Sequence, residues 1–533
     1  MRSSTCSSRD VAYGQIPRSP RSEKHRLAAE WIEGLGRPED HAEMVAHHYR
    51  EALVLGRAAG LDTTSYEEPA RGALGEAGDR ALALNAHDAA LRFYEEALGL
   101  CPESGLERAR LLFGRAKASF LGVDEVGVDP FAEAREAFLE AGDREAAAEA
   151  QVFETISLRS AGRTREAIEG AESAAALLAD APSGSTKARV VANLARNLVF
   201  AGRHEDALSV GRGALAMGEQ LGLGDVTANA MNTIGLARIV MDDFEGIGDL
   251  EESVRLALEH GFPFEIGRAY NNLAFALYSA GQVERASEFA LAALENAERF
   301  GLESRWAEAA VAGNDFSLGR WDEAVHGADE WLENDAPNIN EPSVRAVRAR
   351  IRLARDDVTG AAEDCARALQ NFGDERDVVI PEWMSIICVC AQVALAEGKK
   401  GNAVELIEKL PVHDVAAASA DAWAAVELTL LLDELGRSAA PIVEVAEARP
   451  ALPWLQAAAA FARGEYADAA DRLAEFGVPP LEAAVRLRAA ERLVADGRRA
   501  EADAQLHRAL AFYRSVGATR YIREGEALLA ATA

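Results

Sequence analysis

The chain is poor in aromatic residues, in cysteine and in long apolar stretches. Aromatic side chains make up 6% of its 533 residues although 49% are hydrophobic, so alanine and other aliphatic residues must do most of the packing. The longest apolar run, residues 386–396, is far shorter than the roughly 18–20 residues that a membrane-spanning helix needs. The first residues lack the apolar segment of a signal peptide. Together with an odd number of cysteines, five, these features predict a protein of the reducing cytoplasm.

Positive charge is scarce as well. The chain has 56 basic and 87 acidic residues, and its formal net charge is −31. A nucleic-acid backbone would be repelled on average, so we expect no nucleic-acid partner. The only Gly-Lys pair begins at Gly398, and Val393 stands where a phosphate-binding loop requires its first glycine. A loose dinucleotide-like motif at residues 211–216 lies within a predicted helix and follows no strand. We predict no nucleotide cofactor.

Residues that could carry catalysis or bind a metal are present but do not form a recognisable pattern. No nucleophile, base and orienting group can be identified together, so no enzymatic activity is predicted. Three sets were considered as ligands: Cys388 and Cys390; His41, His47 and His48; and Asp124, Glu125 and Asp129. The cysteines fall on predicted core positions, the histidines favour a surface or interhelical role, and the acidic loop lacks the spacing of a calcium motif. We predict no metal site.

A motif of one glycine and several alanines recurs along the chain. It reads LYSAGQVERA at residues 277–286, and VFAGRHEDA, FSLGRWDEA and VADGRRAEA end at Ala207, Ala324 and Ala502. An alanine follows each glycine after five residues. In several copies an Ala-Leu pair begins twelve residues after the glycine. The period is near 38–40 residues, which predicts about twelve copies. In the degenerate copy between Gly202 and Gly281, Met241 is assigned to the glycine position.

Each copy is predicted to be a hairpin of two amphipathic helices. Apolar residues recur at helical spacing on both sides of the glycine. The glycine ends the first helix by adopting a left-handed conformation. The alanines are small because the two helices approach closely there. One hairpin cannot bury its own apolar stripe, so the copies should stack into an all-α array.

The unit resembles the tetratricopeptide repeat (TPR). Residues 269–294, AYNNLAFALYSAGQVERASEFALAAL, carry that family's aromatic, Leu-small, Gly, Ala and Ala-Leu positions in register. The period exceeds the family's 34 residues, and in this it is similar to the long-helix repeats at the C-terminal end of bacterial signalling ATPases. The resemblance implies an all-α, right-handed superhelical solenoid whose first helices line a concave face.

The two ends of the chain carry a second resemblance. Residues 9–36, 39–53 and 509–533 are similar to the non-catalytic C-terminal region of actinobacterial signalling ATPases, many of which begin with a class III nucleotide cyclase domain. The resemblance implies that the cyclase and ATPase domains would precede residue 1. We expect four parts: a flexible segment at 1–21, a helical linker at 22–68 (helices 22–35 and 39–59), hairpins at 69–516 and a capping helix at 517–533. The loop 121–131 should be long, and residues 337–342 should bend the array.

The predicted partner-binding residues lie on the first helices of three consecutive copies. Counting nine residues back from each assigned glycine position gives an asparagine every time, and arginine and phenylalanine share its helix face. The set is Asn193, Asn232, Asn272, Arg189, Arg196, Arg268 and Phe275. Asparagine amides can clamp an extended peptide, and arginines can bind acidic groups. Alternatively, each asparagine bonds to the neighbouring helix and only stabilises the stack.

We therefore expect a non-catalytic interaction scaffold, the sensor arm of a bacterial signalling system. Its partner would be a protein or peptide, a separate cyclase or ATPase module being one candidate. The alternative is a truncated member of a cyclase/ATPase signalling enzyme family, whose full-length proteins are nucleotide cyclases or ATP-dependent transcriptional regulators. The residues after Gly517 are too few for a helix-turn-helix, and the charge is unsuited to DNA.

Overall fold

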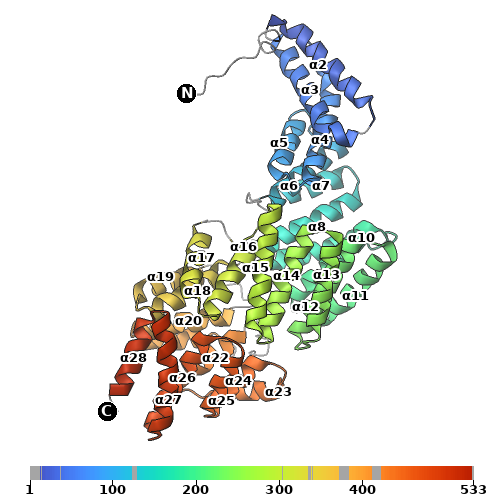
Figure 1. Ribbon diagram of the computed structural model, residues 1–533. Helices are drawn as coiled ribbons and strands as arrows, with labels where there is room; N and C mark the ends of the chain where they lie inside the picture. The colour runs from blue at the N-terminus through green and yellow to red at the C-terminus, as the bar shows by residue number, and fades with distance from the viewer. Residues whose placement is uncertain are drawn as a thin grey trace. The chain divides into compact units, whose positions relative to one another are not determined.

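The computed structural model describes residue 13 and residues 15–36, 38–122, 129–161, 163–302, 304–333, 338, 340–370, 383–410 and 422–530. Within these ranges it contains 27 α-helices, α2 to α28, and no strand (Figure 1). Twelve of the consecutive helix pairs are the predicted hairpins. The all-α fold of stacked TPR-like hairpins is therefore confirmed. Residues 1–12 and 14 of the predicted flexible N-terminal segment lie outside the described residues, as do Asp124 and Glu125 of the long loop.

The chain folds as two compact units. Unit 1 comprises residues 1–157, 173–181 and 301–303, and unit 2 comprises residues 158–172, 182–300 and 304–533. Unit 1 contains α2 (Arg18–Glu33), α3 (Pro38–Ala58), α4 (Thr64–Ala83), α5 (His87–Leu98), α6 (Leu106–Leu121), α7 (Asp129–Glu140) and most of α8 (Arg144–Ser160). The first hairpin begins at Thr64 and not near Pro69, which lies inside α4.

Unit 2 is a continuous series of hairpins closed by a single helix. After the end of α8, its helices are α9 (Thr164–Leu177), α10 (Ser185–Phe200), α11 (His204–Leu221), α12 (Gly224–Val240), α13 (Gly246–His260), α14 (Pro263–Ser279), α15 (Val283–Phe300), α16 (Arg305–Ser317), α17 (Trp321–Leu332), α18 (Glu341–Ala354), α19 (Val358–Gln370), α20 (Trp383–Ala396), α21 (Lys400–Glu408), α22 (Ala422–Glu434), α23 (Ala440–Ala448), α24 (Pro453–Ala462), α25 (Tyr466–Glu475), α26 (Pro479–Ala495), α27 (Arg499–Ser515) and α28 (Thr519–Ala530). From α10 to α20 the first helices of neighbouring hairpins contact one another, and we call this series of helices the inner row.

The turns inside the hairpins explain why the repeat can be recognised in the sequence. Gly281 has φ 77°, and the next amide, Gln282, donates a hydrogen bond back to the carbonyl of Leu277 (2.8 Å). In the following helix Ala286 is fully buried, as its small size requires. The assignment of Met241 to the glycine position is wrong: Met241 has φ −96°, and Asp242 takes the left-handed conformation with φ 65°. Aspartate tolerates this conformation better than most residues because its short side chain can bond locally.

Four consecutive turns of unit 2 contact hairpins from the C-terminal end of the same unit. Their residues with positive φ form what we call the turn row, namely Asp242, Gly281, Gly319 and Asp356. Ion pairs hold its two ends. Arg449, which follows α23, donates two hydrogen bonds to Asp242 (2.6 and 2.5 Å), and Arg523 of α28 donates two to Asp356 (2.8 and 3.0 Å).

Aromatic rings cover the two glycines in the middle of the turn row. A Cβ atom added to Gly281 would lie 2.8 Å from the ring of Phe476, and one added to Gly319 would lie 2.9 Å from the ring of Phe512. Trp454 stacks on Tyr278 beside them and donates a hydrogen bond to its carbonyl (3.0 Å). Each hairpin of this region therefore packs on more than its sequence neighbours, unlike the units of a simple linear array.

Several residues considered as ligands are structural. Cys388 and Cys390 are buried in the core, as the repeat positions predict. Residues 211–216 lie within α11, where Gly211 packs against Ile234.

No helix among the described residues is long and apolar enough to cross a membrane.

Candidate functional site

Three arginines gather on the inner row of unit 2, and we call them the inner arginine cluster. They are Arg159 at the end of α8, Arg196 on α10 and Arg268 on α14. Arg159 and Arg268 are buried, with 3% and 8% of their surface exposed, whereas Arg196 is half-buried. Buried arginine is rare and normally requires an anionic partner. The cluster is therefore an unusual concentration of positive charge.

The partners of Arg159 and Arg268 neutralise only part of the positive charge and leave one buried donor without an acceptor. Arg268 forms an ion pair with Glu265 (2.9 Å) and donates a hydrogen bond to the carbonyl of Asn229 (3.3 Å), but its Nη1 is buried without a partner. Arg159 donates to the amide oxygen of Asn197 (3.3 Å) and lies over the ring of Phe200. Within the described part of the chain, Glu265 is the one carboxylate that acts on this cluster: it pairs with Arg268 and its charge acts on Arg196.

Arg196 has no hydrogen bond or ion pair to any described residue. Burial lowers the pKa of Arg196 well below its usual range, the charges of Arg159 and Arg268 lower it further, and Glu265 opposes them. Burial, followed by the charge of Arg268, also lowers the pKa of Arg159 to about 9. With a pKa of about 9, Arg159 is protonated at neutral pH, and arginine in general keeps its positive charge in proteins. The local potential is therefore positive although the chain as a whole carries −31.

The equivalent position in a later hairpin shows what such an arginine binds. Arg196 lies six residues before Gly202, and Arg350 lies six residues before Asp356. Arg350 donates two hydrogen bonds to the carboxylate of Glu427 on α22 (2.8 and 2.7 Å). Both side chains of that pair are less than 10% exposed. At this position of the hairpin, a guanidinium group can thus accept a carboxylate delivered by another helix.

The predicted row of asparagines is only partly as expected. Asn232 and Asn193 are buried, with 1% and 4% of their surface exposed, and Asn272 is half-buried. The Asn272 amide donates to the Asn232 oxygen (2.5 Å), so these two bond across neighbouring helices and are not the exposed, unpaired amides that a peptide clamp would offer. Because Asp242 is the true turn residue, Thr233 shares the position of Asn193 and Asn272, and Asn232 is displaced by one residue.

The remaining predicted site residues fall into two groups. Phe275 lies six residues before Gly281, at the position that Arg196 occupies in its own hairpin, and is half-buried. Arg189 is bound instead by Asp225 at the start of α12 (2.8 Å). Sequence reasoning missed Arg159, because it lies outside the positions that were compared. It also missed Glu265, which stands one turn before Arg268.

Three buried amide atoms of α12 and α14 have no hydrogen-bond partner among the described residues. The Asn229 oxygen, the Asn232 amide nitrogen and the Asn271 oxygen are buried and make no hydrogen bond. Such atoms are uncommon in a folded protein, and a region that collects several of them can bind a polar ligand at lower desolvation cost. Together with Arg196, these atoms make the inner surface of α10, α12 and α14 the best candidate for a binding site.

Two of the three histidines considered as metal ligands, His47 and His48, lie beside His25 in unit 1, and His41 makes no ring contact with them. His25 on α2 bonds to His48 on α3 (Nδ1 to Nδ1, 2.8 Å), and His47 lies beside both rings. Burial, followed by the neighbouring histidines, lowers the pKa of His25, and burial followed by His47 lowers that of His48. Among the residues that the structure describes, no group of three or more His, Cys, Asp or Glu side chains could hold a metal ion.

Comparisons with known proteins give structural likenesses only. No protein-family model and no curated protein match the sequence. A solved structure of the APC/C hetero-tetramer Cut9–Hcn1 is similar to 86% of this chain and 93% of its own, with 11% identity and a TM-score of 0.43. A Rap protein complexed with competence and sporulation factor is similar over 72% and 99%, with 14% identity and a TM-score of 0.42. A signal transduction ATPase with a tetratricopeptide repeat sensor, from Pyrococcus horikoshii, is similar over 68% and 54%, with 14% identity and a TM-score of 0.37.

Proposed function

We propose that this chain is a non-catalytic interaction scaffold that binds an acidic segment of a partner protein on the inner surface of α10, α12 and α14. The observation that carries the proposal is the contrast between Arg196 and Arg350. Both occupy the same position of their hairpins, and Arg350 has the carboxylate of Glu427 whereas Arg196 has no such partner. A carboxylate from another protein would relieve the repulsion among three arginines.

The composition of the surface supports a protein segment as the ligand. Phe200 lies under the guanidinium group of Arg159, and Phe275 occupies in its own hairpin the position of Arg196; both are half-buried and can pack against apolar side chains. Asn272 keeps an amide oxygen that can accept a hydrogen bond from a peptide backbone. Asn193, Asn232 and Arg268 would line the same surface, and Arg189 would contribute at its edge, bound to Asp225.

The signalling context rests on the resemblance of residues 9–53 and 509–533 to the C-terminal region of signalling ATPases. Under this proposal the scaffold is a sensor arm, and a separate cyclase or ATPase module is one candidate partner. A fluorescent ATP analogue distinguishes the scaffold from an enzyme remnant: no saturable binding is expected, and tight Mg²⁺-dependent binding would overturn the non-catalytic proposal.

Peptide selection tests the acidic partner directly. A random peptide library displayed on phage would be selected against the full chain and counter-selected against Arg196→Leu. Arg212→Leu is the matched control, because Arg212 is exposed on α11, the other helix of the same hairpin. Peptides that share an Asp or Glu at a fixed position, and that bind the control as well as the parent, would support the proposal. Peptides without a common acidic residue, or equal binding to Arg196→Leu, would refute it.

A further inference from the structure

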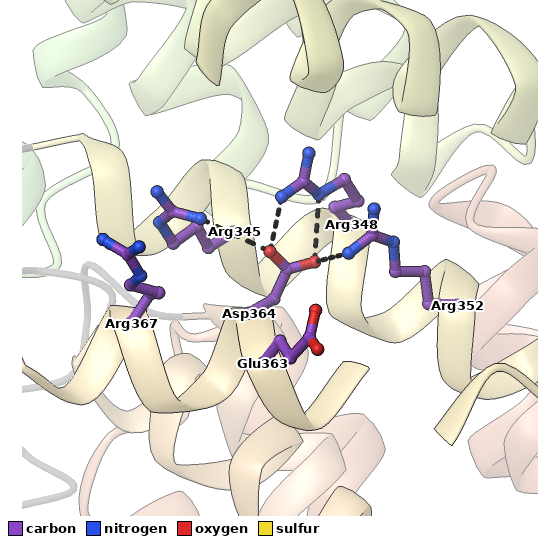
Figure 2. A pocket seen from close by; sticks show the side chains of 6 residues that line it. All are labelled: Arg345, Arg348, Arg352, Glu363, Asp364 and Arg367. Atoms are coloured by element: carbon purple, nitrogen blue, oxygen red, sulfur yellow. Dashed lines mark hydrogen bonds and ion pairs between the residues drawn. The ribbon is translucent and has the colours of Figure 1, made fainter. Parts of the chain in front are cut away.

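A second positively charged site lies elsewhere in unit 2, between α18 and α19. It is a cavity of about 300 Å³ (Figure 2). Six charged residues line it: Arg345, Arg348, Arg352, Glu363, Asp364 and Arg367. Four guanidinium groups thus face two carboxylates in a chain whose net charge is −31. This site is distinct from the inner arginine cluster and does not depend on the function proposed for it.

The spacing of the arginines follows from helix geometry. Arg345, Arg348 and Arg352 follow the i, i+3, i+7 pattern, so they share one face of α18. Asp364 and Arg367 lie one turn apart on α19, which packs against that face. Figure 2 shows the four arginine side chains around Asp364, with Arg367 next to Arg345. The three arginines of α18 therefore form one side of the cavity, and Glu363, Asp364 and Arg367 of α19 form the other.

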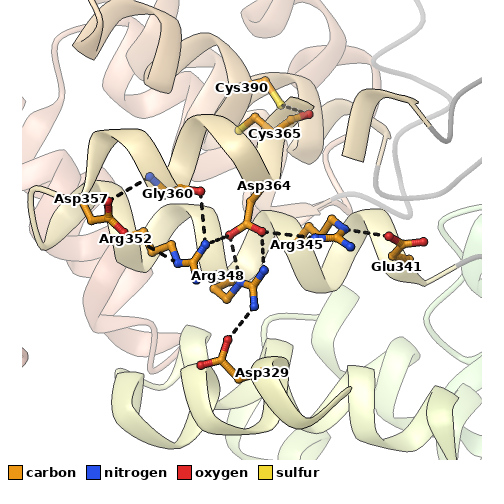
Figure 3. A network of polar contacts seen from close by, with 10 residues as sticks. All are labelled: Asp329, Glu341, Arg345, Arg348, Arg352, Asp357, Gly360, Asp364, Cys365 and Cys390. Atoms are coloured by element: carbon orange, nitrogen blue, oxygen red, sulfur yellow. Dashed lines mark hydrogen bonds and ion pairs between the residues drawn. The ribbon is translucent and has the colours of Figure 1, made fainter. Parts of the chain in front are cut away.

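A buried carboxylate fixes the arginines in place. Asp364 is 1% exposed and accepts hydrogen bonds from Nε and Nη2 of Arg348 (2.9 and 2.6 Å) and from Nη1 of Arg352 (2.9 Å). A longer contact of 3.5 Å joins it to Nη1 of Arg345. The Sγ of Cys390 on α20 donates a weak hydrogen bond to the backbone carbonyl of Cys365, the next residue in α19 (4.0 Å; Figure 3). Because one carboxylate holds three guanidinium groups, their positions are set before any ligand arrives.

Several donors at the cavity are not used by this network. Arg348 is fully engaged, since its Nη1 also binds Asp329 (2.6 Å). Arg345 uses Nε for Glu341 (2.7 Å), and no described residue accepts a hydrogen bond from its Nη2. Nη2 of Arg352 likewise donates no hydrogen bond to any described residue. Arg367 is exposed and makes no ion pair with any residue that the structure describes. The free donors come from two helices, α18 and α19, and line one cavity (Figure 2).

We propose that this cavity binds the phosphate group of a small molecule, held by Arg345, Arg352 and Arg367. Asp364 neutralises only part of the positive charge of the four arginines. The donors that remain are numerous enough for an anion that carries more charge and more acceptor oxygens than a carboxylate. A phosphate monoester carries three acceptor oxygens and nearly two negative charges at neutral pH, and arginine forks match its geometry. The volume leaves room for a group beyond the phosphate.

The test is a titration of the full chain at constant ionic strength with three probes: inorganic phosphate, ribose 5-phosphate and AMP, with ribose as the uncharged control. Saturable binding of at least one phosphate probe is expected, and none of ribose. Tightest binding of inorganic phosphate would identify the free ion as the ligand, and tighter binding of a phosphate ester would identify an esterified ligand. No saturable binding of any phosphate probe would overturn the proposal.

Two variants localise the binding. Arg367→Gln removes an exposed arginine without a partner, and the affinity for the bound probe is expected to fall about tenfold or more with an unchanged Tm. Arg352→Gln should reduce it as well, and Arg212→Gln, on α11, should leave it unchanged. If the affinity is the same in Arg367→Gln and Arg352→Gln as in the parent chain, the phosphate binds elsewhere and the proposal is wrong.

Discussion

Arg196 and Arg350 occupy the same position of two hairpins, and only Arg350 is paired with a buried carboxylate, that of Glu427. The difference leads to opposite expectations for stability. Arg350→Leu leaves Glu427 buried without a countercharge and should lower the free energy of unfolding by about 3–5 kcal/mol. Arg196→Leu removes an unpaired charge and should be neutral or stabilising, since Leu236 fills the equivalent place in α12. Denaturant unfolding followed by circular dichroism measures both. Equal losses in the two variants would mean that Arg196 has a stabilising partner after all.

The alanine positions of the repeat give a second prediction. Ala286 is fully buried where α15 meets α14, so Ala286→Leu should cost about 1–3 kcal/mol through overpacking. Glu284 is exposed on the same helix, and Glu284→Ala should change stability by less than about 0.5 kcal/mol. The melting temperatures of the two variants measure the contrast. Similar shifts for both would contradict the assignment of Ala286 to the helix interface.

The turn row should couple parts of unit 2 that are far apart in sequence. Arg449→Ala removes two hydrogen bonds to Asp242, so amide hydrogen exchange should accelerate both around residue 449 and in the α12–α13 turn. Arg463→Ala is the control, because Arg463 pairs locally with Glu447 on the surface. Faster exchange confined to the neighbourhood of residue 449 would show that the turn-row contact contributes little.

The histidines of unit 1 predict a loss of stability in mild acid. The pKa values of His25 and His48 are lowered in the folded chain, so protonation favours unfolding. The contribution of these groups is complete above their ordinary value of about 6.5 and decreases as the pH falls from there toward the lowered values. The amides of α2 and α3 should therefore have lower protection factors, which correct exchange rates for the intrinsic effect of pH, at pH 5.5 than at pH 7.5. His48→Gln should weaken that dependence, and an unchanged dependence would assign it to other groups.

The sequence was sufficient for the hairpins but not for their long-range contacts. Gly281 and Ala286 determine a turn and a helix interface within a few residues, and that local chemistry is repeated often enough to be recognised. Phe476 and Phe512 look like ordinary apolar residues of their own hairpins, and nothing local indicates that they cover Gly281 and Gly319. Contacts between distant segments depend on how the hairpins stack along the unit, which the repeat pattern alone does not encode.

The binding residues were predictable only in part, for a related reason. Arg196 and Arg268 were found because each shares a helix face with an asparagine that lies nine residues before a turn glycine. Asn232 was placed one residue out of register, because Asp242 takes a left-handed conformation that a glycine pattern does not anticipate. The arginines around Asp364 could have been recognised from the i, i+3, i+7 pattern in α18, which stands out in an acidic chain.

A double-mutant cycle between Arg196 and the carboxylate of a selected peptide tests the central proposal most directly. The four Kd values are those of the parent chain and Arg196→Leu, each with the acidic peptide and with its Asp→Asn or Glu→Gln counterpart. If Arg196 binds that carboxylate, the coupling energy should be about 1.5–3 kcal/mol, as expected for a hydrogen bond between charged groups. A coupling energy indistinguishable from zero, with tight binding retained in Arg196→Leu, would contradict the proposal that the inner arginine cluster recognises an acidic partner.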